Sequence, residues 1–275
     1  MSDRRARLAA RRAALAKRDK VARRPRVPLD VAEAYTGALR SLNRDLASEV
    51  RSWIAPEITR MREEQRRQDA PGDLDFGALR IRLERIAKDR ALDIVDRFGR
   101  RINRWNLDDL EDVLRIDIDL EPPAVRRMLE AWRRENVDLI TSIAKRLHAD
   151  VRDTVREAAR RGSRVEDLTS EIRDRFDVSQ SRANLIARDQ VLKANADLTV
   201  ARCSEVGITR YRWSTSHDER VRGTPGGKWP RGLHYALDGR IFAFDDPPIV
   251  NAEGDRANPG TDYQCRCVAI PILGD

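Results

Sequence analysis

The sequence has few cysteines and lacks long apolar runs, and each shortage excludes a class of protein. Its 275 residues include three cysteines, Cys203, Cys265 and Cys267. Three are too few for a disulfide framework and indicate synthesis in a reducing cytoplasm. A membrane-spanning helix needs about 18 consecutive apolar residues, and the basic N-terminus lacks the apolar segment of a secretory signal. We therefore expect a protein without membrane partners.

Aromatic residues are also scarce, at 5%, whereas charged residues make up 36% of the chain. This balance is typical of long amphipathic helices with solvated faces and not of a compact β-rich domain. Nine of the 14 glycines lie at or after Gly207, which indicates loops there. The composition predicts an elongated α+β protein whose N-terminal two-thirds are mainly helical and whose C-terminal part is small and mixed.

The positive charge is concentrated at the N-terminus. Residues 1–30 hold eleven Lys/Arg and three acids, so their net charge equals the +8 of the whole chain. Such residues neutralise DNA phosphates and release counterions, although a solvated tail or a helix that binds an acidic partner explains the charge as well. We expect residues 1–28 to form a flexible arm, interrupted by its prolines. The candidate DNA-binding residues are Arg4, Arg5, Arg7, Arg11, Arg12, Lys17, Arg18, Lys20, Arg23 and Arg24.

Apolar residues at steps of three and four predict helices after the arm. One stripe runs from Val31 to Trp53 and is expected to end near Pro56, with a polar helical stretch beyond it. Further stripes cover 76–102 and 123–155, whereas 106–121 is ambiguous. Because such helices bury one face only against another element, some of these faces are expected to await a partner.

Two more helices are expected before the glycine-rich region. Ser163 and Glu166 have the spacing of a capping box and predict a short helix around 168–176. Ser179 can cap a second helix, which Gly207 would end in the left-handed conformation. After it, the segments 208–213, 240–242 and 268–270 are strand candidates.

The C-terminal part carries several polar motifs in a fixed order. They are Trp213-Ser214-Thr215, Asp218-x-Arg220-x-Arg222, His234-x-x-Leu237-Asp238-Gly239 and Cys265-Arg266-Cys267. Over about residues 125–273 this order resembles the Mu F-like family of phage head morphogenesis proteins. Two features depart from the family pattern: the spacer between Arg222 and His234 is long, and Gln264 stands where Asn is common.

The resemblance implies a minor head (minor capsid) protein that acts in virion assembly and is not an enzyme. Its implied partners are the portal, the major capsid protein or a scaffold, with double-stranded DNA as a further partner through the arm. Its implied location is the head interior and the cytoplasm of a bacterial host, which includes a prophage setting. The expected domains are the arm at 1–28, a helical region at 29–122 and a Mu F-like domain at 123–275, helical to 206 and mixed over 207–275.

Cys265 and Cys267 are two residues apart on a predicted strand, so both thiols are expected to face one side. With His234 they offer three ligands suited to zinc, and His217, Asp218 or Asp238 could supply a fourth. Alternatively, the thiols fill a core and His234 hydrogen-bonds to a loop. The C-x-C spacing is not that of a zinc ribbon, so both interpretations stay open.

Asp218, Arg220 and Arg222 alternate, and in an extended segment Asp218 would pair with either arginine. A rival hypothesis is a nuclease or toxin-like enzyme on a phage-head scaffold with a histidine base, although no Ser-His-Asp set or phosphate loop is apparent. A zinc-stabilised binding module without a phage role is a third hypothesis. The residues expected to have motif or structural roles are Trp213, Asp218, Arg220, Arg222, Asp238 and Gly239.

Overall fold

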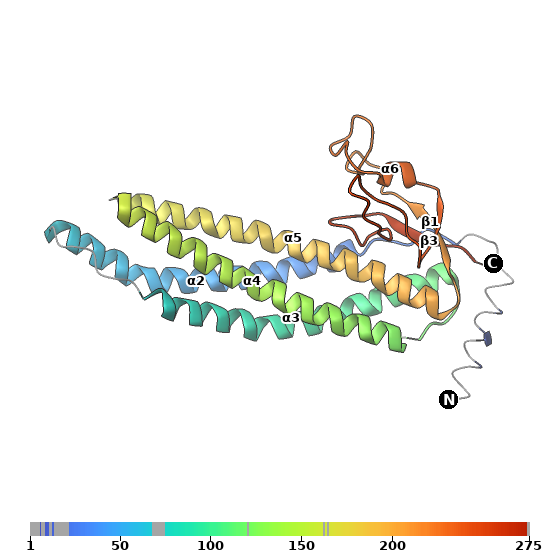
Figure 1. The fold of residues 1–275 in the computed structure, drawn as a ribbon. Coiled ribbons are helices and arrows are strands. Elements are labelled where there is room, and N and C mark those ends of the chain that lie inside the picture. Colours follow the sequence, from blue (N-terminus) through green and yellow to red (C-terminus); the bar gives the residue numbers. More distant parts are fainter. Residues whose placement is uncertain are drawn as a thin grey trace. The chain divides into compact units, whose positions relative to one another are not determined.

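The computed structural model describes residues 6, 9–10, 13, 22–67, 75–119, 121–161, 163 and 165–273. The predicted α+β fold with a helical N-terminal part is confirmed (Figure 1). None of the described helices is long and apolar enough to span a membrane. In chain order the elements are α2 (Leu29–Arg67), α3 (Phe76–Leu114), α4 (Pro123–Arg161), α5 (Val165–Glu205), β1 (Arg210–Ser214), α6 (His234–Leu237), β2 (Ile241–Ala243) and β3 (Val268–Pro271).

The chain divides into two compact units, and each long helix contributes to both. Unit 1 comprises Met1–Ala32, Phe98–Trp132 and Asp189–Asp275, and unit 2 comprises Glu33–Arg97 and Arg133–Arg188. Both units therefore combine segments that are far apart in the sequence. The division into an arm, a helical region and a Mu F-like domain stays a prediction.

Unit 2 is a bundle of four helical segments in which each segment contacts the next. Salt bridges and hydrogen bonds join the neighbours, and the fourth segment closes on the first. In order around the bundle these contacts are Arg90–Asp45 (2.6 Å) between α3 and α2, His148 Nε2 to the Phe76 carbonyl (2.9 Å) between α4 and α3, Arg161–Glu171 (2.9 Å) between α4 and α5, and Ser179 Oγ to Asn43 Oδ1 (2.5 Å) between α5 and α2.

The apolar stripes of unit 2 are covered by the chain itself. Tyr35, Leu39, Leu42 and Leu46 of α2 are fully buried, and each such side chain contributes roughly 1.5–3 kcal/mol on burial. The Tyr35 hydroxyl donates to Asn136 Oδ1 at 2.8 Å, which satisfies a polar pair inside this core. The bundle thus buries the α2 stripe itself.

Two predicted helix boundaries were wrong. Pro56 lies inside α2; the carbonyl that it leaves without a donor belongs to Ser52, which is exposed, so water can satisfy it. Ser179 lies inside α5 and is buried, and its hydroxyl bonds to Asn43 instead of capping a helix. At Ser179 a contact with another helix overrides the local signal.

Other boundaries were predicted well. Gly207 has φ 83° and ends α5; its N–H donates to the Ser204 carbonyl, and the Ile208 N–H donates to the Cys203 carbonyl. These two bonds form a Schellman motif. The ambiguous segment 106–121 begins as helix because Leu107 and Leu110 of α3 enter the core of unit 1.

Unit 1 contains a three-stranded antiparallel sheet in the order β2-β1-β3. The three strand candidates are confirmed with ends shifted by one or two residues. Trp213 and Tyr211 of β1 are fully buried and form the core of this unit with apolar residues of α3 and α5 and with Cys265 and Cys267. The strand pairing thus brings the C-terminal cysteines into the core.

The end of the predicted arm packs on unit 1. The Ala22 N–H donates to the carbonyl of Pro271, the last residue of β3 (3.1 Å). The Arg24 guanidinium donates to Ser214 Oγ and to the Thr215 carbonyl at 3.0 Å each, and Arg23 pairs with Asp112 at 2.8 Å. Residues 22–28 thus differ from the flexible segment that the sequence suggested. The remaining candidate DNA-binding residues, Arg4, Arg5, Arg7, Arg11, Arg12, Lys17, Arg18 and Lys20, lie outside the described residues.

Candidate metal centre

The long spacer between Arg222 and His234 folds into a tight loop. The Gly223 N–H donates to the Trp229 carbonyl (2.8 Å), and the Tyr235 N–H donates to the Arg222 carbonyl (2.9 Å). Gly223 has φ +82°, and a Cβ there would lie 2.3 Å from the Gly232 carbonyl oxygen, so only glycine fits. The loop therefore returns the chain to Arg222 and places His234 beside it, despite its length.

His234, at the start of α6, meets both C-terminal cysteines. Its Nδ1 atom lies 3.5 Å from Cys265 Sγ and 3.6 Å from Cys267 Sγ, and the three ligand atoms all lie within 4.8 Å of one another. The side chains are enclosed: His234 is 2% exposed, Cys265 5% and Cys267 6%. The two cysteines precede β3 and are not part of it, yet both thiols reach the same ring nitrogen.

The opposite nitrogen of His234 faces a carboxylate. Nε2 lies 3.1 Å from Asp262 Oδ2, and Arg222 donates to the same oxygen and to the Tyr263 carbonyl. The Tyr263 N–H donates to the other Asp262 oxygen at 2.6 Å. Asp262 is therefore fixed in place and orients the imidazole so that Nδ1 faces the thiols.

The ionisable groups of this cluster shift one another's pKa. Burial would lower the pKa of His234, but hydrogen bonds to Asp262 and Cys265 outweigh it and raise that pKa to about 9. A hydrogen bond from the Cys267 thiol and contact with His234 hold the pKa of Cys265 below its usual value despite burial. The same hydrogen bond together with burial raises the pKa of Cys267. The cluster thus favours one thiolate next to an imidazolium.

The cysteine segment is held by α5 and by an unusual backbone conformation. The Gln264 N–H donates to Asp189 Oδ1 at 2.7 Å, and Lys193 pairs with Asp189 at 2.8 Å. Gln264 has φ 52°, a left-handed conformation that asparagine adopts more easily than other side chains that carry a Cβ.

The segment that contains His234, Cys265 and Cys267 is similar to known proteins. Residues 149–270 match the model of the family described as Phage Mu protein F like protein. This part of the chain is therefore similar to that family. A Haemophilus influenzae protein (strain ATCC 51907 / DSM 11121 / KW20 / Rd), described as an uncharacterized protein, is 41% identical over 151 residues. The match covers 55% of this chain but 31% of that relative, so the chain spans less than a third of its length. No solved structure matches.

The Mu F-like region contains α5, the sheet and all members of the His234 cluster. The predicted metal ligands His234, Cys265 and Cys267 come together within it. Sequence reasoning missed Asp262, whose one available signal was a carboxylate three residues before Cys265.

The predicted arrangement of the Asp218 segment was wrong. His217 has φ 55° and the residues after it form turns, so the segment is not extended. Asp218 Oδ1 accepts hydrogen bonds from the backbone N–H of Arg220 and from Arg266 Nη2 at 2.7 Å. Arg222, the other predicted partner, pairs with Asp262.

Asp238 and Gly239 stabilise the end of β1. Asp238 Oδ1 accepts the Thr215 backbone N–H at 2.7 Å, and Oδ2 lies 3.1 Å from His217 Nε2. Gly239 has φ 76°, and its N–H donates to the Trp213 carbonyl at 2.9 Å. In the described part of the chain, His217, Asp218 and Asp238 do not join the three convergent ligands, so they are not a fourth ligand in this arrangement.

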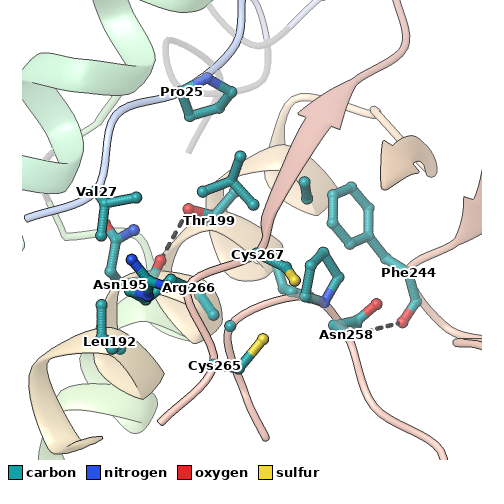
Figure 2. A pocket seen from close by; sticks show the side chains of 16 residues that line it. Pro25, Val27, Leu192, Asn195, Thr199, Phe244, Asn258, Cys265, Arg266 and Cys267 are labelled. Atoms are coloured by element: carbon teal, nitrogen blue, oxygen red, sulfur yellow. Dashed lines mark hydrogen bonds between the residues drawn. The ribbon is translucent and has the colours of Figure 1, made fainter. Parts of the chain in front are cut away.

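The space next to the cysteines is too small for a substrate. The pocket there has a volume of about 20 Å³, and Cys265 and Cys267 line it together with Pro25, Leu192 and Phe244 (Figure 2). A ligand pocket usually encloses about 300–1,000 Å³, whereas about 10–15 Å³ suffices for one water molecule. The order thiol, imidazole, carboxylate would suit a nucleophile, but these thiols are covered. The arrangement therefore suits an ion better than a substrate.

Proposed function

We propose that this chain is a minor head protein that is built into the phage capsid during head assembly and binds the portal. The observation that carries the proposal is the Mu F-like match over residues 149–270. The rival hypothesis of a nuclease or toxin-like enzyme has less support, because the cluster of thiols, imidazole and carboxylate is enclosed.

An exposed apolar surface on unit 1 supports contact with another protein. A groove of about 420 Å³ is lined mainly by apolar side chains, among them Leu233, Phe242 and Ile249. Leu233 is 40% and Ile249 43% exposed, and Tyr235 and Ile241 close by in the sequence are also exposed. Large exposed apolar patches rimmed by polar residues mark interaction sites. Arg240, Asp246 and Arg256 supply the polar lining of this groove.

We also propose that the basic arm contacts packaged DNA. Residues 1–21 carry eight of the ten candidate residues, whereas Arg23 and Arg24 form contacts within unit 1. The candidate residues that we propose to contact DNA are therefore those before Ala22, whose Arg and Lys side chains can neutralise phosphates.

Incorporation into heads tests the assembly role. The chain is produced together with the portal and major capsid proteins of the same phage, and its amount in purified heads is measured. Ile249→Asp should reduce incorporation by about 10- to 100-fold, because an apolar side chain contributes roughly 1.5–3 kcal/mol on burial. Ile81→Asp, at a residue of unit 2 that is 64% exposed, is the matched control and should incorporate normally.

Two results would contradict the assembly role. One is that heads formed in the presence of the wild-type chain contain none of it. The other is that the purified chain cleaves DNA or RNA while heads assemble equally well without it. The second result would favour the enzyme hypothesis.

A further inference from the structure

We infer that His234 Nδ1, Cys265 Sγ and Cys267 Sγ bind one zinc ion in the Mu F-like region, with Asp262 as the positioning residue for the imidazole. This inference goes beyond the assembly role and rests on the geometry of unit 1.

The distances between the ligand atoms fit a shared ion. Zinc lies about 2.3 Å from thiolate sulfur and about 2.0–2.1 Å from imidazole nitrogen, and at tetrahedral angles these lengths separate the two ligand atoms by roughly 3.5 Å. The observed separations are 3.5 Å to Cys265 and 3.6 Å to Cys267. Both nitrogen–sulfur separations thus match the value that zinc requires, and the two sulfur atoms lie within 4.8 Å of each other.

Hydrogen bonding alone accounts less well for this arrangement. An imidazole nitrogen has either one lone pair or one N–H, so His234 Nδ1 cannot form well-directed bonds with two thiols at once. The sulfur atoms are nevertheless almost equidistant from it. An ion bound by all three atoms would satisfy the nitrogen and both sulfurs together.

The surroundings of His234 match those of a metal ligand. Histidines that bind metals usually donate their other N–H to a carboxylate, which fixes the tautomer and the ring orientation. Asp262 Oδ2 occupies this position at 3.1 Å from Nε2, and Arg222 holds the carboxylate. Trp213 interacts with Cys267, but in the described part of the chain no hydrogen bond of ordinary geometry satisfies its buried indole N–H. A metal-bound thiolate would supply a stronger acceptor next to it.

Charge balance also favours a divalent ion with soft ligands. Two thiolates and one neutral imidazole offset the charge of Zn²⁺, so the buried site would carry no net charge and would avoid a large desolvation cost. Asp262 is balanced separately by Arg222. Thiolate and imidazole ligands select zinc over magnesium or calcium. Because the protein supplies three ligands, a water molecule would occupy the fourth coordination position of the zinc ion.

The ion would join two segments that contain little regular structure. His234 follows the glycine-rich loop after Arg222, and the cysteines end the irregular segment between β2 and β3. His234 and Cys265 are 31 residues apart in the sequence. A bond that closes such a loop removes conformational freedom from the unfolded chain, so zinc should stabilise unit 1.

Metal content and thiol protection test the inference on the full chain. Protein produced with added zinc, and purified under reducing conditions without chelator, should contain about one zinc ion per chain. Cys265→Ser and Cys267→Ser should each lose it. Cys203→Ser is the matched control, because Cys203 is also fully buried but lies outside the cluster. In the wild-type protein, Cys265 and Cys267 should react with a thiol reagent only after a chelator is added, a readout that does not depend on the folding of any variant.

Asp262→Asn tests the positioning role. Zinc affinity, measured by competition with a chromophoric chelator, should fall by about 10- to 100-fold, while the variant still fills with excess zinc. Cobalt in place of zinc should show thiolate charge-transfer bands that Cys265→Ser alters and Cys203→Ser does not. Three results would overturn the inference: wild-type protein without zinc, zinc content unchanged in both cluster variants, or a disulfide between Cys265 and Cys267 that persists in protein purified under reducing conditions.

Discussion

At the scale of single residues, Asp238 shows how one carboxylate can hold a turn. Its oxygens accept the backbone N–H and hydroxyl of Thr215 and contact His217. Burial alone would raise the pKa of Asp238, but the bond from the Thr215 N–H and the contact with His217 outweigh it and lower that pKa below its ordinary value of 3.8.

The lowered pKa of Asp238 predicts a pH dependence of stability. Because the folded-state pKa is below the unfolded one, the contribution is fully present above about pH 4 and is lost as the pH falls through the folded value. Asp238→Asn should therefore have a lower thermal midpoint than wild type at pH 7. The difference between the two midpoints should become smaller as the pH falls below 4. The exposed Asp245→Asn serves as control. Midpoints that fall in parallel for Asp238→Asn and wild type would contradict this account.

At the scale of elements, a buried arginine joins α5 to α3 within unit 1. Arg202 is fully buried, and its guanidinium donates to the side-chain oxygens of Asn106 and Asn103 at 2.5 Å each. Burial lowers the pKa of Arg202 to about 10, so it remains charged at neutral pH. The helix periodicity did not reveal this network, because it depends on how two helices face each other.

Removing Arg202 should destabilise the protein strongly. Arg202→Met leaves the Asn103 and Asn106 oxygens buried without their donor, and each unsatisfied group costs about 1–3 kcal/mol. We expect a loss of roughly 3 kcal/mol in the free energy of unfolding, measured by urea denaturation. Arg173→Met on the exposed face of α5 should change it by less than about 0.5 kcal/mol. Equal losses in both variants would refute the buried network as the cause.

At the scale of the whole molecule, the N-terminal 28 residues are expected to have two separate roles. Deleting residues 1–21 removes eight Lys/Arg and two acids, and should weaken DNA binding and reduce its dependence on salt concentration. The thermal midpoint should stay unchanged. Deleting residues 1–28 should also lower the midpoint, because the contacts of Arg24 with Ser214 and of Arg26 with Asp109 are lost.

Two measurements separate these roles. Binding to double-stranded DNA at several salt concentrations gives the slope for each chain, and calorimetry gives the midpoint. If the chain without residues 1–21 binds DNA with the full-length slope, the arm does not contact DNA. If the chain without residues 1–28 melts like the full-length protein, the contacts of residues 22–28 contribute nothing to stability.

The sequence by itself determined the class of the fold and most of the elements. Apolar periodicity located the long helices, glycine density located the mixed region, and Gly207 marked the end of α5, because these signals depend on neighbours in the chain. The ordered motifs were sufficient for the Mu F-like resemblance. The continuity of α5 through Ser179 was not predictable in this way, because a contact with another helix outweighs the local preference there.

Only the tertiary structure decided which side chains meet. Asp262 lies 28 residues from His234 in the sequence, Asp218 lies 48 from Arg266, and Arg24 lies 190 from Ser214. No spacing rule links such residues, since a loop of any length can bring its ends together at a cost that grows slowly with its length. Sequence reasoning could list His234, Cys265 and Cys267 as candidate ligands. Both cysteine sulfurs lie near Nδ1 of His234, and Asp262 lies near Nε2. This arrangement depends on the path of the loops after Arg222 and before β3.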